Sequence, residues 1–93
     1  MTEEEAMKCL NKGRDYLNEG ETQLAWNEYN KVETEIFDSS IKAEAIFGEG
    51  VVYAIERNYS AAIDKFEKVL TVNPNHPNAM AYREKARQAW YSR

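Results

Sequence analysis

The sequence is poor in the residues that carry covalent and metal chemistry. Among its 93 residues there is one cysteine, Cys9, and one histidine, His76. A single cysteine excludes a disulfide bond within the chain and leaves no cysteine and histidine set for a structural zinc ion. No glycine-rich phosphate loop, nucleophile elbow or metal-spaced triplet occurs either. We therefore expect neither a cofactor nor a metal ion, and no enzymatic activity.

Long apolar runs and an excess of basic residues are also missing. The longest purely apolar run is residues 51–55, whereas a membrane span needs roughly 18–20 residues. The first residues are acidic and lack the basic flank of a secretory signal. A net charge of −4 disfavours nucleic acid, because phosphate binding draws on clustered lysine and arginine. These absences and the lone cysteine predict a cytoplasmic protein whose partner is another protein or peptide, not a membrane or a nucleic acid.

Proline and glycine are scarce, and both prolines and Gly20 fall where helices are expected to begin or end. Apolar residues recur at three- and four-residue steps through five stretches, and no stretch alternates as a strand would. Thr2 and Glu5 have the spacing of a helix-capping box, and Gly20 suits a helix C-terminus. Further boundaries are expected at residues 38–40, at 57–58 (where Asn58 can cap the next helix) and at 73–77. The sequence therefore predicts an all-α fold of five helices.

One pattern occurs twice at a fixed spacing. Gly13, Tyr16, Ala25, Tyr29 and Val32 are repeated thirty-seven residues later as Gly50, Tyr53, Ala62, Phe66 and Val69. A unit of this size cannot bury its own apolar face, so neighbouring copies must stack on one another. The repeat therefore predicts a short helical solenoid. The repeated residues are packing residues, and the variable positions between them are the candidates for binding.

The second copy resembles the tetratricopeptide repeat (TPR), a helix–turn–helix unit of about 34 residues. The matching residues are Ile46, Gly50, Tyr53, Ala62, Phe66 and Pro74, and the first copy aligns through Cys9, Gly13, Tyr16, Ala25 and Tyr29. Ile46 replaces the family's common tryptophan, and Glu49 replaces its leucine, which weakens the match there. The resemblance implies a right-handed superhelix of antiparallel helix hairpins, 1–37 and 38–74, closed by a capping helix at 75–93. The repeat offset exceeds the family's by three residues, expected near 34–40 as a longer second helix or a wider loop.

TPR proteins commonly bind an extended or helical peptide in a concave groove lined by the first helix of each hairpin. By this resemblance, the groove positions here are Met7, Leu10, Arg14, Glu44, Phe47, Val51, Asn78, Ala81 and Lys85. Leu10, Phe47 and Val51 would anchor a peptide; alternatively, Phe47 packs against the neighbouring helix within the core. Some TPR proteins hold the carboxylates of chaperone tails in a basic clamp. Only Arg14 is basic at the clamp positions, so we expect no binding of that type.

The remaining distinctive residues each have a structural interpretation beside a functional one. Cys9 is expected to be a small buried apolar residue rather than a catalytic thiol. His76, which lies near two prolines, is expected to be a solvated loop residue rather than a ligand or a base. Trp90 and Tyr91 either seal the end of the core or form an exposed patch that docks another chain. The expected function is a protein-interaction adaptor; the alternative is a structural subunit that self-associates through its C-terminal helix, for example as a homodimer.

Overall fold

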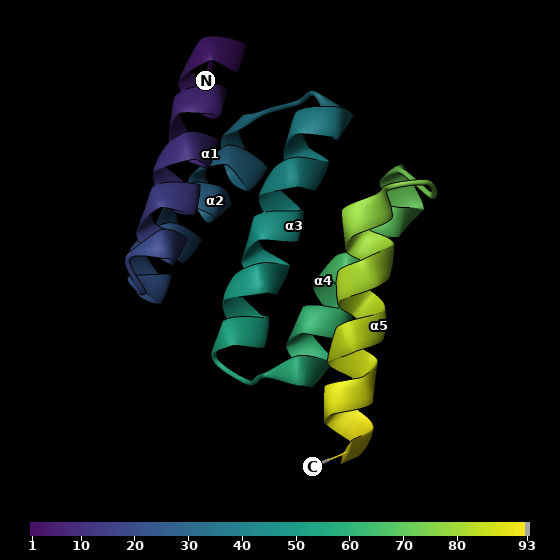
Figure 1. The fold of residues 1–93 in the computed structure, drawn as a ribbon. Helices are drawn as coiled ribbons and strands as arrows, with labels where there is room; N and C mark the ends of the chain where they lie inside the picture. Colours follow the sequence, from purple (N-terminus) through teal and green to yellow (C-terminus); the bar gives the residue numbers. More distant parts are fainter. Residues whose placement is uncertain (93) are drawn as a thin grey trace.

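The computed structural model describes residues 1–92 and contains five α-helices in that range. They are α1 (Glu3–Asn18), α2 (Thr22–Glu35), α3 (Ser39–Ile55), α4 (Tyr59–Val72) and α5 (Pro77–Ser92). Each helix packs against the next along the chain, and α3 also contacts α1 and α5. In Figure 1, α1, α3 and α5 lie side by side on the near face, with α2 and α4 behind them. The predicted all-α helical-repeat fold is confirmed.

The helix boundaries follow three of the predicted capping signals, and one of these is Gly20, which follows α1 in the left-handed conformation (φ 78°). At the start of α1, Thr2 Oγ1 accepts a hydrogen bond from the Glu5 N–H at 3.1 Å, and Glu5 Oε1 accepts one from the Thr2 N–H at 2.9 Å. At the start of α3, the Asp38 carboxylate caps the helix. The prediction is wrong in detail at the α3–α4 turn, because Asn58 makes no side-chain cap bond and Arg57 adopts the left-handed conformation (φ 64°). Local backbone bonds close that turn instead: the Asn58 N–H donates to the Tyr53 carbonyl at 2.8 Å and the Arg57 N–H to the Ala54 carbonyl at 3.1 Å.

The three residues by which the repeat exceeds the family length lie next to the predicted stretch 34–40, but not in either of the two predicted forms. α2 and α4 have the same length, 14 residues each. The α2–α3 connection at 36–38 is no wider than the α4–α5 connection at 73–76. Both predicted alternatives, a longer second helix and a wider loop, are therefore wrong. The extra length lies in α3, which Asp38 caps early and which at 17 residues is the longest helix of residues 1–92.

Two aromatic rings account for the repeated glycines. A Cβ atom added at Gly13 or Gly48 would lie 2.7 or 2.5 Å from the Tyr29 ring, and one added at Gly50 would lie 2.6 Å from the Phe66 ring. Both rings are buried. Each therefore occupies the space that a side chain on α1 or α3 would fill, which fixes how closely the helices approach. Because Tyr29 of α2 lies against both α1 and α3, one residue joins the first hairpin to the second.

α3 is the central helix and contributes to the core on both sides. Val52 is buried in a cluster with Val32 of α2, and Ile46 is buried in a cluster with Val69 of α4. The helix also carries charged residues, as do the other four. None of the helices within residues 1–92 combines the length and the apolar character needed to cross a lipid bilayer.

Candidate functional site

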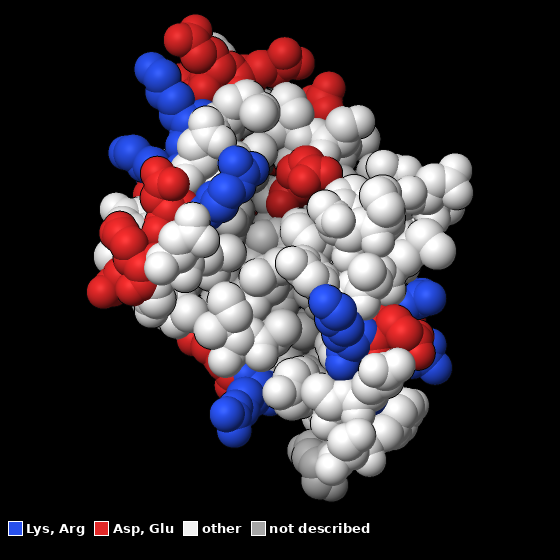
Figure 2. Space-filling model, viewed as in Figure 1, with Lys and Arg blue, Asp and Glu red and all other residues white. Residues whose placement is uncertain are grey.

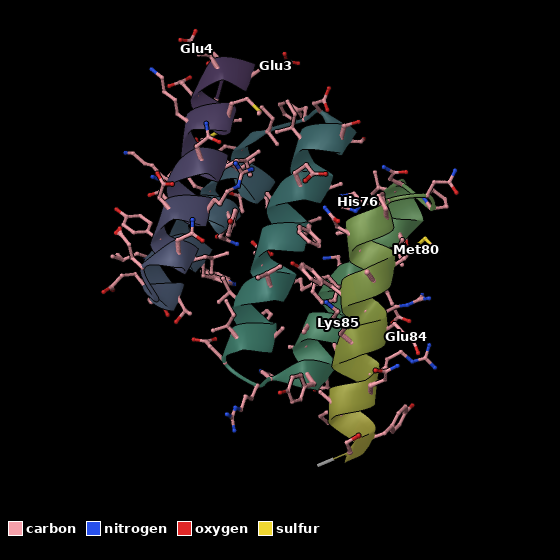
Figure 3. All side chains as sticks on the ribbon, in the orientation of Figure 1. Glu3, Glu4, His76, Met80, Glu84 and Lys85 are labelled. Carbon is pink, nitrogen blue, oxygen red and sulfur yellow. The ribbon has the colours of Figure 1, made fainter. Side chains whose placement is uncertain are left out.

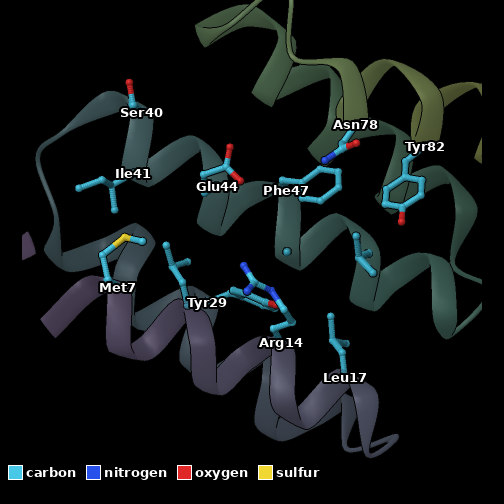
Figure 4. Close-up of a pocket in the computed structure, with 13 residues that line it drawn as sticks. Met7, Arg14, Leu17, Tyr29, Ser40, Ile41, Glu44, Phe47, Asn78 and Tyr82 are labelled. Atoms are coloured by element: carbon cyan, nitrogen blue, oxygen red, sulfur yellow. The ribbon is translucent and has the colours of Figure 1, made fainter. Parts of the chain in front are cut away.

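An open groove of about 520 Å³ lies between α1, α3 and the first turns of α5 (Figure 4). Seven of the nine residues predicted to line a groove surround it: Met7, Leu10, Arg14, Glu44, Phe47, Val51 and Asn78. Ala81 does not line it, and Lys85 lines a neighbouring hollow instead. The rest of the wall is formed by Leu17, Tyr29, Ser40, Ile41, Gly48 and Tyr82. This space is named the concave groove below.

The apolar part of the concave groove is built around Phe47. Its ring stacks on Tyr82 of α5, with centroids 5.3 Å apart and planes 5° from parallel. It also meets the rings of Phe66 and His76 at 5.6 and 5.3 Å. Phe47 therefore packs against neighbouring helices, as one of its two predicted interpretations required, and still lines the groove. Its role as a peptide anchor stays a prediction.

Two oppositely charged side chains line the concave groove from different helices. Arg14 projects from α1 and Glu44 from α3 (Figure 4). Within residues 1–92, no carboxylate lies within 4 Å of the Arg14 guanidinium. Its charge acts instead on the phenol of Tyr29, whose pKa burial raises and Arg14 partly lowers again. The N–H donors of Arg14 are therefore available to a ligand.

His76 is not the solvated loop residue that the sequence suggested. It is 6% exposed, and its Nδ1 accepts a hydrogen bond from the Ala79 N–H at 3.0 Å, which caps α5. Because Nδ1 accepts, the ring carries its proton on Nε2, which donates to Glu44 Oε1 at 2.8 Å. His76 thus fixes Glu44 at the edge of the concave groove. No local sequence signal marks this role, since the two residues are 32 positions apart.

Charge is unevenly distributed over the face that contains the concave groove. Figure 2 shows acidic groups gathered at the N-terminal end, and acidic groups with basic ones among them along the outer edge of the α1–α2 hairpin, while the hollowed centre is largely uncharged. Glu3 and Glu4 lie at that N-terminal end (Figure 3). On α5, Lys85 lies on the inner side, whereas Met80 and Glu84 lie on the outer side (Figure 3). The groove is thus a mainly apolar surface with a few fixed charges, a combination that suits peptide recognition.

A second hollow of about 480 Å³ adjoins the concave groove near the C-terminal end of α3. It is lined by Val51, Ala54, Ile55, Tyr59, Phe66, Tyr82, Lys85, Ala86 and Ala89, of which only Lys85 is charged. Val51 and Tyr82 line both spaces, so these two residues form the boundary between them. Lys85 Nζ lies 5.6 Å from the centroid of the Tyr82 ring, within the range of a cation–π contact. This space is named the C-terminal hollow below.

On the side of α3 that faces α2 and α4, Glu49 lies in a buried charged network. Glu49 is 0% exposed, and its Oε1 lies 2.8 Å from Lys65 Nζ of α4, an ion pair without good hydrogen-bond angles. Its Oε2 accepts a long hydrogen bond, 3.4 Å, from Asn30 Nδ2 of α2. Lys65 Nζ also lies 3.9 Å from a carboxylate oxygen of Glu33. These four residues, named the buried seam below, join α2, α3 and α4.

The surroundings of the buried seam strongly shift the pKa of Glu49. Desolvation, reinforced by Glu33, raises the pKa of Glu49 to about 7, although Lys65 acts in the opposite direction. Desolvation opposes the charge of Lys65 as well, but the attraction of Glu49 and Glu33 leaves its pKa above the ordinary value. The sequence identified Glu49 only as a poor match to the family's leucine. Its real surroundings depend on three helices at once.

The other residues singled out from the sequence lie outside both spaces. Cys9 is partly buried against the core of the first hairpin. Burial and the nearby Glu28 raise the pKa of its thiol, which keeps it protonated, unlike an activated nucleophile. Trp90 is partly buried and Tyr91 is 75% exposed, so Tyr91 is the more accessible member of the predicted patch. Across residues 1–92, no group of three or more His, Cys, Asp or Glu could hold a metal ion.

Comparison with known proteins gives a partial match. The chain is 39% identical over 77 residues to tetratricopeptide repeat protein 14 of the mouse, Mus musculus. The match covers 83% of this chain, and the chain spans about 10% of the length of that relative. No protein-family profile matches the chain, and no solved structure matches it. The similarity and the helical architecture of residues 1–92 together fit a TPR-like protein.

Proposed function

We propose that the chain is a TPR domain, with hairpins at 1–37 and 38–74 and a capping helix at 75–93, and that its concave groove binds a peptide segment of a partner protein. The observation that supports this most is the groove itself, which α1, α3 and α5 line together. Its volume of about 520 Å³ lies within the range of ligand-binding clefts, about 300–1,000 Å³. The relative's name, a TPR protein, supports a protein partner.

The lining of the groove suggests how a peptide would be held. Apolar side chains of the peptide would displace water over Leu10, Phe47 and Val51. A carboxylate of the peptide would accept two parallel N–H bonds from Arg14. Glu44 would accept from a basic side chain, and because His76 already holds it, little further ordering is required. A segment with a few apolar residues and charges of both signs is therefore the best match.

The proposed role is that of a non-enzymatic adaptor or scaffold in the cytoplasm. The TPR-named relative supports the first part of this statement, and the lone cysteine supports the second. The alternative, a subunit that self-associates through its C-terminal helix, has weaker support. Of the two aromatic residues that it requires, Tyr91 alone is mainly exposed, at 75%, and a single tyrosine offers little area for a stable interface.

A displayed library of random peptides tests the proposal without knowledge of the natural partner. Peptides selected on the wild-type domain are expected to bind at least about tenfold more weakly to Val51→Asp and to Arg14→Glu, because both changes alter the groove. Val72→Asp makes the same change at an exposed valine outside both spaces and should leave binding unchanged. Thermal melts confirm that each variant is folded. Selected peptides that bind all three variants like the wild type would contradict the groove assignment.

A further inference from the structure

Phe37 is the most exposed large apolar side chain in residues 1–92, with 98% of its surface accessible. It lies in the α2–α3 connection between two residues with extended backbone, Ile36 (φ −108°, ψ 140°) and Asp38 (φ −64°, ψ 120°). Both neighbours are fixed, because Ile36 is buried and Asp38 caps α3. Phe37 is therefore presented to solvent on a rigid support. Exposing a large aromatic ring to water is unfavourable, so a partner that buried the ring would gain the hydrophobic free energy of that burial.

The C-terminal hollow is an apolar space of a size that a large aromatic side chain could enter. Its volume is about 480 Å³, within the range of clefts that bury ligands. Its rim is open, since Ile55 is 51% exposed and Tyr82 is 40% exposed. The fully buried Phe66 contributes to its lining and offers an aromatic contact.

A chain cannot fill its own C-terminal hollow with its own Phe37. Phe37 precedes the first turn of α3, whereas the hollow surrounds the last turns, at Val51, Ala54 and Ile55. α3 has 17 residues, so its two ends are roughly 25 Å apart at 1.5 Å per residue. Phe37 of a second copy has no such constraint. The two surfaces lie at opposite ends of α3 and differ from each other, so the contact is head-to-tail and leaves one free Phe37 and one free hollow at the ends of each assembly.

The charges beside the two surfaces are complementary. Glu35 is exposed, lies two residues before Phe37, and has no basic side chain within 4 Å among residues 1–92. Lys85 is the single charged residue that lines the hollow, and no carboxylate of the described chain lies within 4 Å of it. Insertion of Phe37 would bring the two unpaired charges toward each other, which favours the correct pairing over others.

From the shape, the polarity and these charges, we infer that Phe37 of one copy inserts into the C-terminal hollow of a second copy, with Glu35 beside Lys85. The occupant of the hollow is thus another molecule of this chain. The inference goes beyond peptide binding and does not rest on it, because the hollow is separate from the concave groove except at Val51 and Tyr82.

Light scattering of the purified protein over a concentration series tests the inference. The apparent mass of the wild type is expected to rise above the 10.8 kDa of one chain as the concentration increases. Phe37→Asp removes the inserted ring, and Ile55→Glu places a carboxylate at the rim of the hollow; each should weaken association at least about tenfold. Leu24→Asp, a matched change at an exposed leucine outside both spaces, should associate like the wild type. Circular dichroism confirms that the variants keep their helices.

Mixing the two defective variants makes the test specific. Phe37→Asp keeps an intact hollow and Ile55→Glu keeps an intact Phe37, so an equal mixture should form a complex that stops at two chains. The inference is overturned if the wild type stays monomeric up to about 1 mM, if Phe37→Asp associates like the wild type, or if the mixture forms no dimer. Association that Tyr91→Ser abolishes and Phe37→Asp does not would place the interface on the C-terminal helix. Peptide selection is run on the dilute domain, at a concentration at which self-association is not expected. Its success or failure is therefore independent of the result of the light-scattering test.

Discussion

The two glutamates of the middle of α3 lie on different sides of the helix and have different surroundings. Glu44 borders the concave groove, its side chain is 52% exposed, and the ring of His76 donates to it at 2.8 Å. Glu49 lies in the buried seam at 0% exposure beside Lys65, with its pKa raised to about 7. One carboxylate is fixed in position but open to a ligand, and the other is closed to solvent and joins three helices. The comparison suggests that α3 binds with one side and holds the repeat together with the other.

The largest effect on stability is expected from removing the cation of the buried seam. Lys65→Met keeps most of the side-chain length but leaves Glu49 buried without its countercharge. The free energy of unfolding at pH 8 should fall by about 3 kcal/mol, and by less at pH 5, where Glu49 is protonated. Denaturant titration at the two pH values measures this. Lys68→Met is the matched control: the Lys68 side chain is 61% exposed and its Nζ atom lies 4.0 Å from Glu33, so a loss as large as that of Lys65→Met would contradict the assignment.

Glu49 should also make the stability of the wild type depend on pH. Its pKa is about 7 in the folded chain and about 4.3 in an unfolded one. The folded state therefore binds more protons between these values, and the free energy of unfolding falls as the pH rises from about 4 to about 7. The share that comes from Glu49 is about 3–4 kcal/mol. Glu49→Gln removes that share, so the difference in the free energy of unfolding between wild type and variant should change with pH. Denaturant titration over this pH range measures it. A difference that stays constant would show that Glu49 is not the source of the pH dependence.

A smaller loss is expected from Gly48→Ala, at the boundary between the groove side and the core. The new Cβ atom would lie 2.5 Å from the buried Tyr29 ring, which also lies 2.7 Å from the Cβ position of Gly13 on α1. Overpacking should cost about 1–3 kcal/mol, more than the roughly 1 kcal/mol that alanine gains in a helix. Thermal melting measures the net change. Gly20→Ala is a control that isolates the backbone effect. A Cβ atom at Gly20 would have no atom within 4 Å, so any loss of stability there comes from its φ of +78° and not from a clash. A Gly48→Ala variant more stable than the wild type would rule out the close approach.

The smallest effect belongs to His76, which links the groove side to α5. His76→Ala removes the cap of α5 and should cost about 1 kcal/mol. His76→Asn supplies a different cap and should recover most of that loss in a melting experiment, without restoring the contact with Glu44. Peptides that use Glu44 should then bind more weakly to both variants. If the two variants melt at the same temperature, the capping role of the Nδ1 atom is wrong.

Local signals made the fold predictable. The Thr2–Glu5 box and the Asp38 cap act within three residues, and the glycine–aromatic pairs recur in both copies. Most of the predicted groove positions also line one space, because they depend only on helix periodicity once the hairpins are placed. Whether that space binds a peptide stays a prediction.

The features that the sequence did not reveal involve contacts between distant elements. His76 and Glu44 are 32 residues apart, and the Glu49 carboxylate meets partners on two other helices. The position of the extra residues depended on where α3 begins, which length comparison alone could not decide. The sequence alone does not show whether a charged residue at an apolar position is tolerated. The free energy of burying its charge depends on partners that only the packed helices bring together.

The most direct test of the two-sided view of α3 is the affinity of one library-selected peptide for Val51→Asp and for Glu49→Gln, measured by titration on folded protein. The first variant changes the groove side and the second changes the buried seam. We predict at least about a tenfold loss of affinity for Val51→Asp and an affinity within about twofold of the wild type for Glu49→Gln. An unchanged affinity for Val51→Asp, or an equal loss in both variants, would contradict the account.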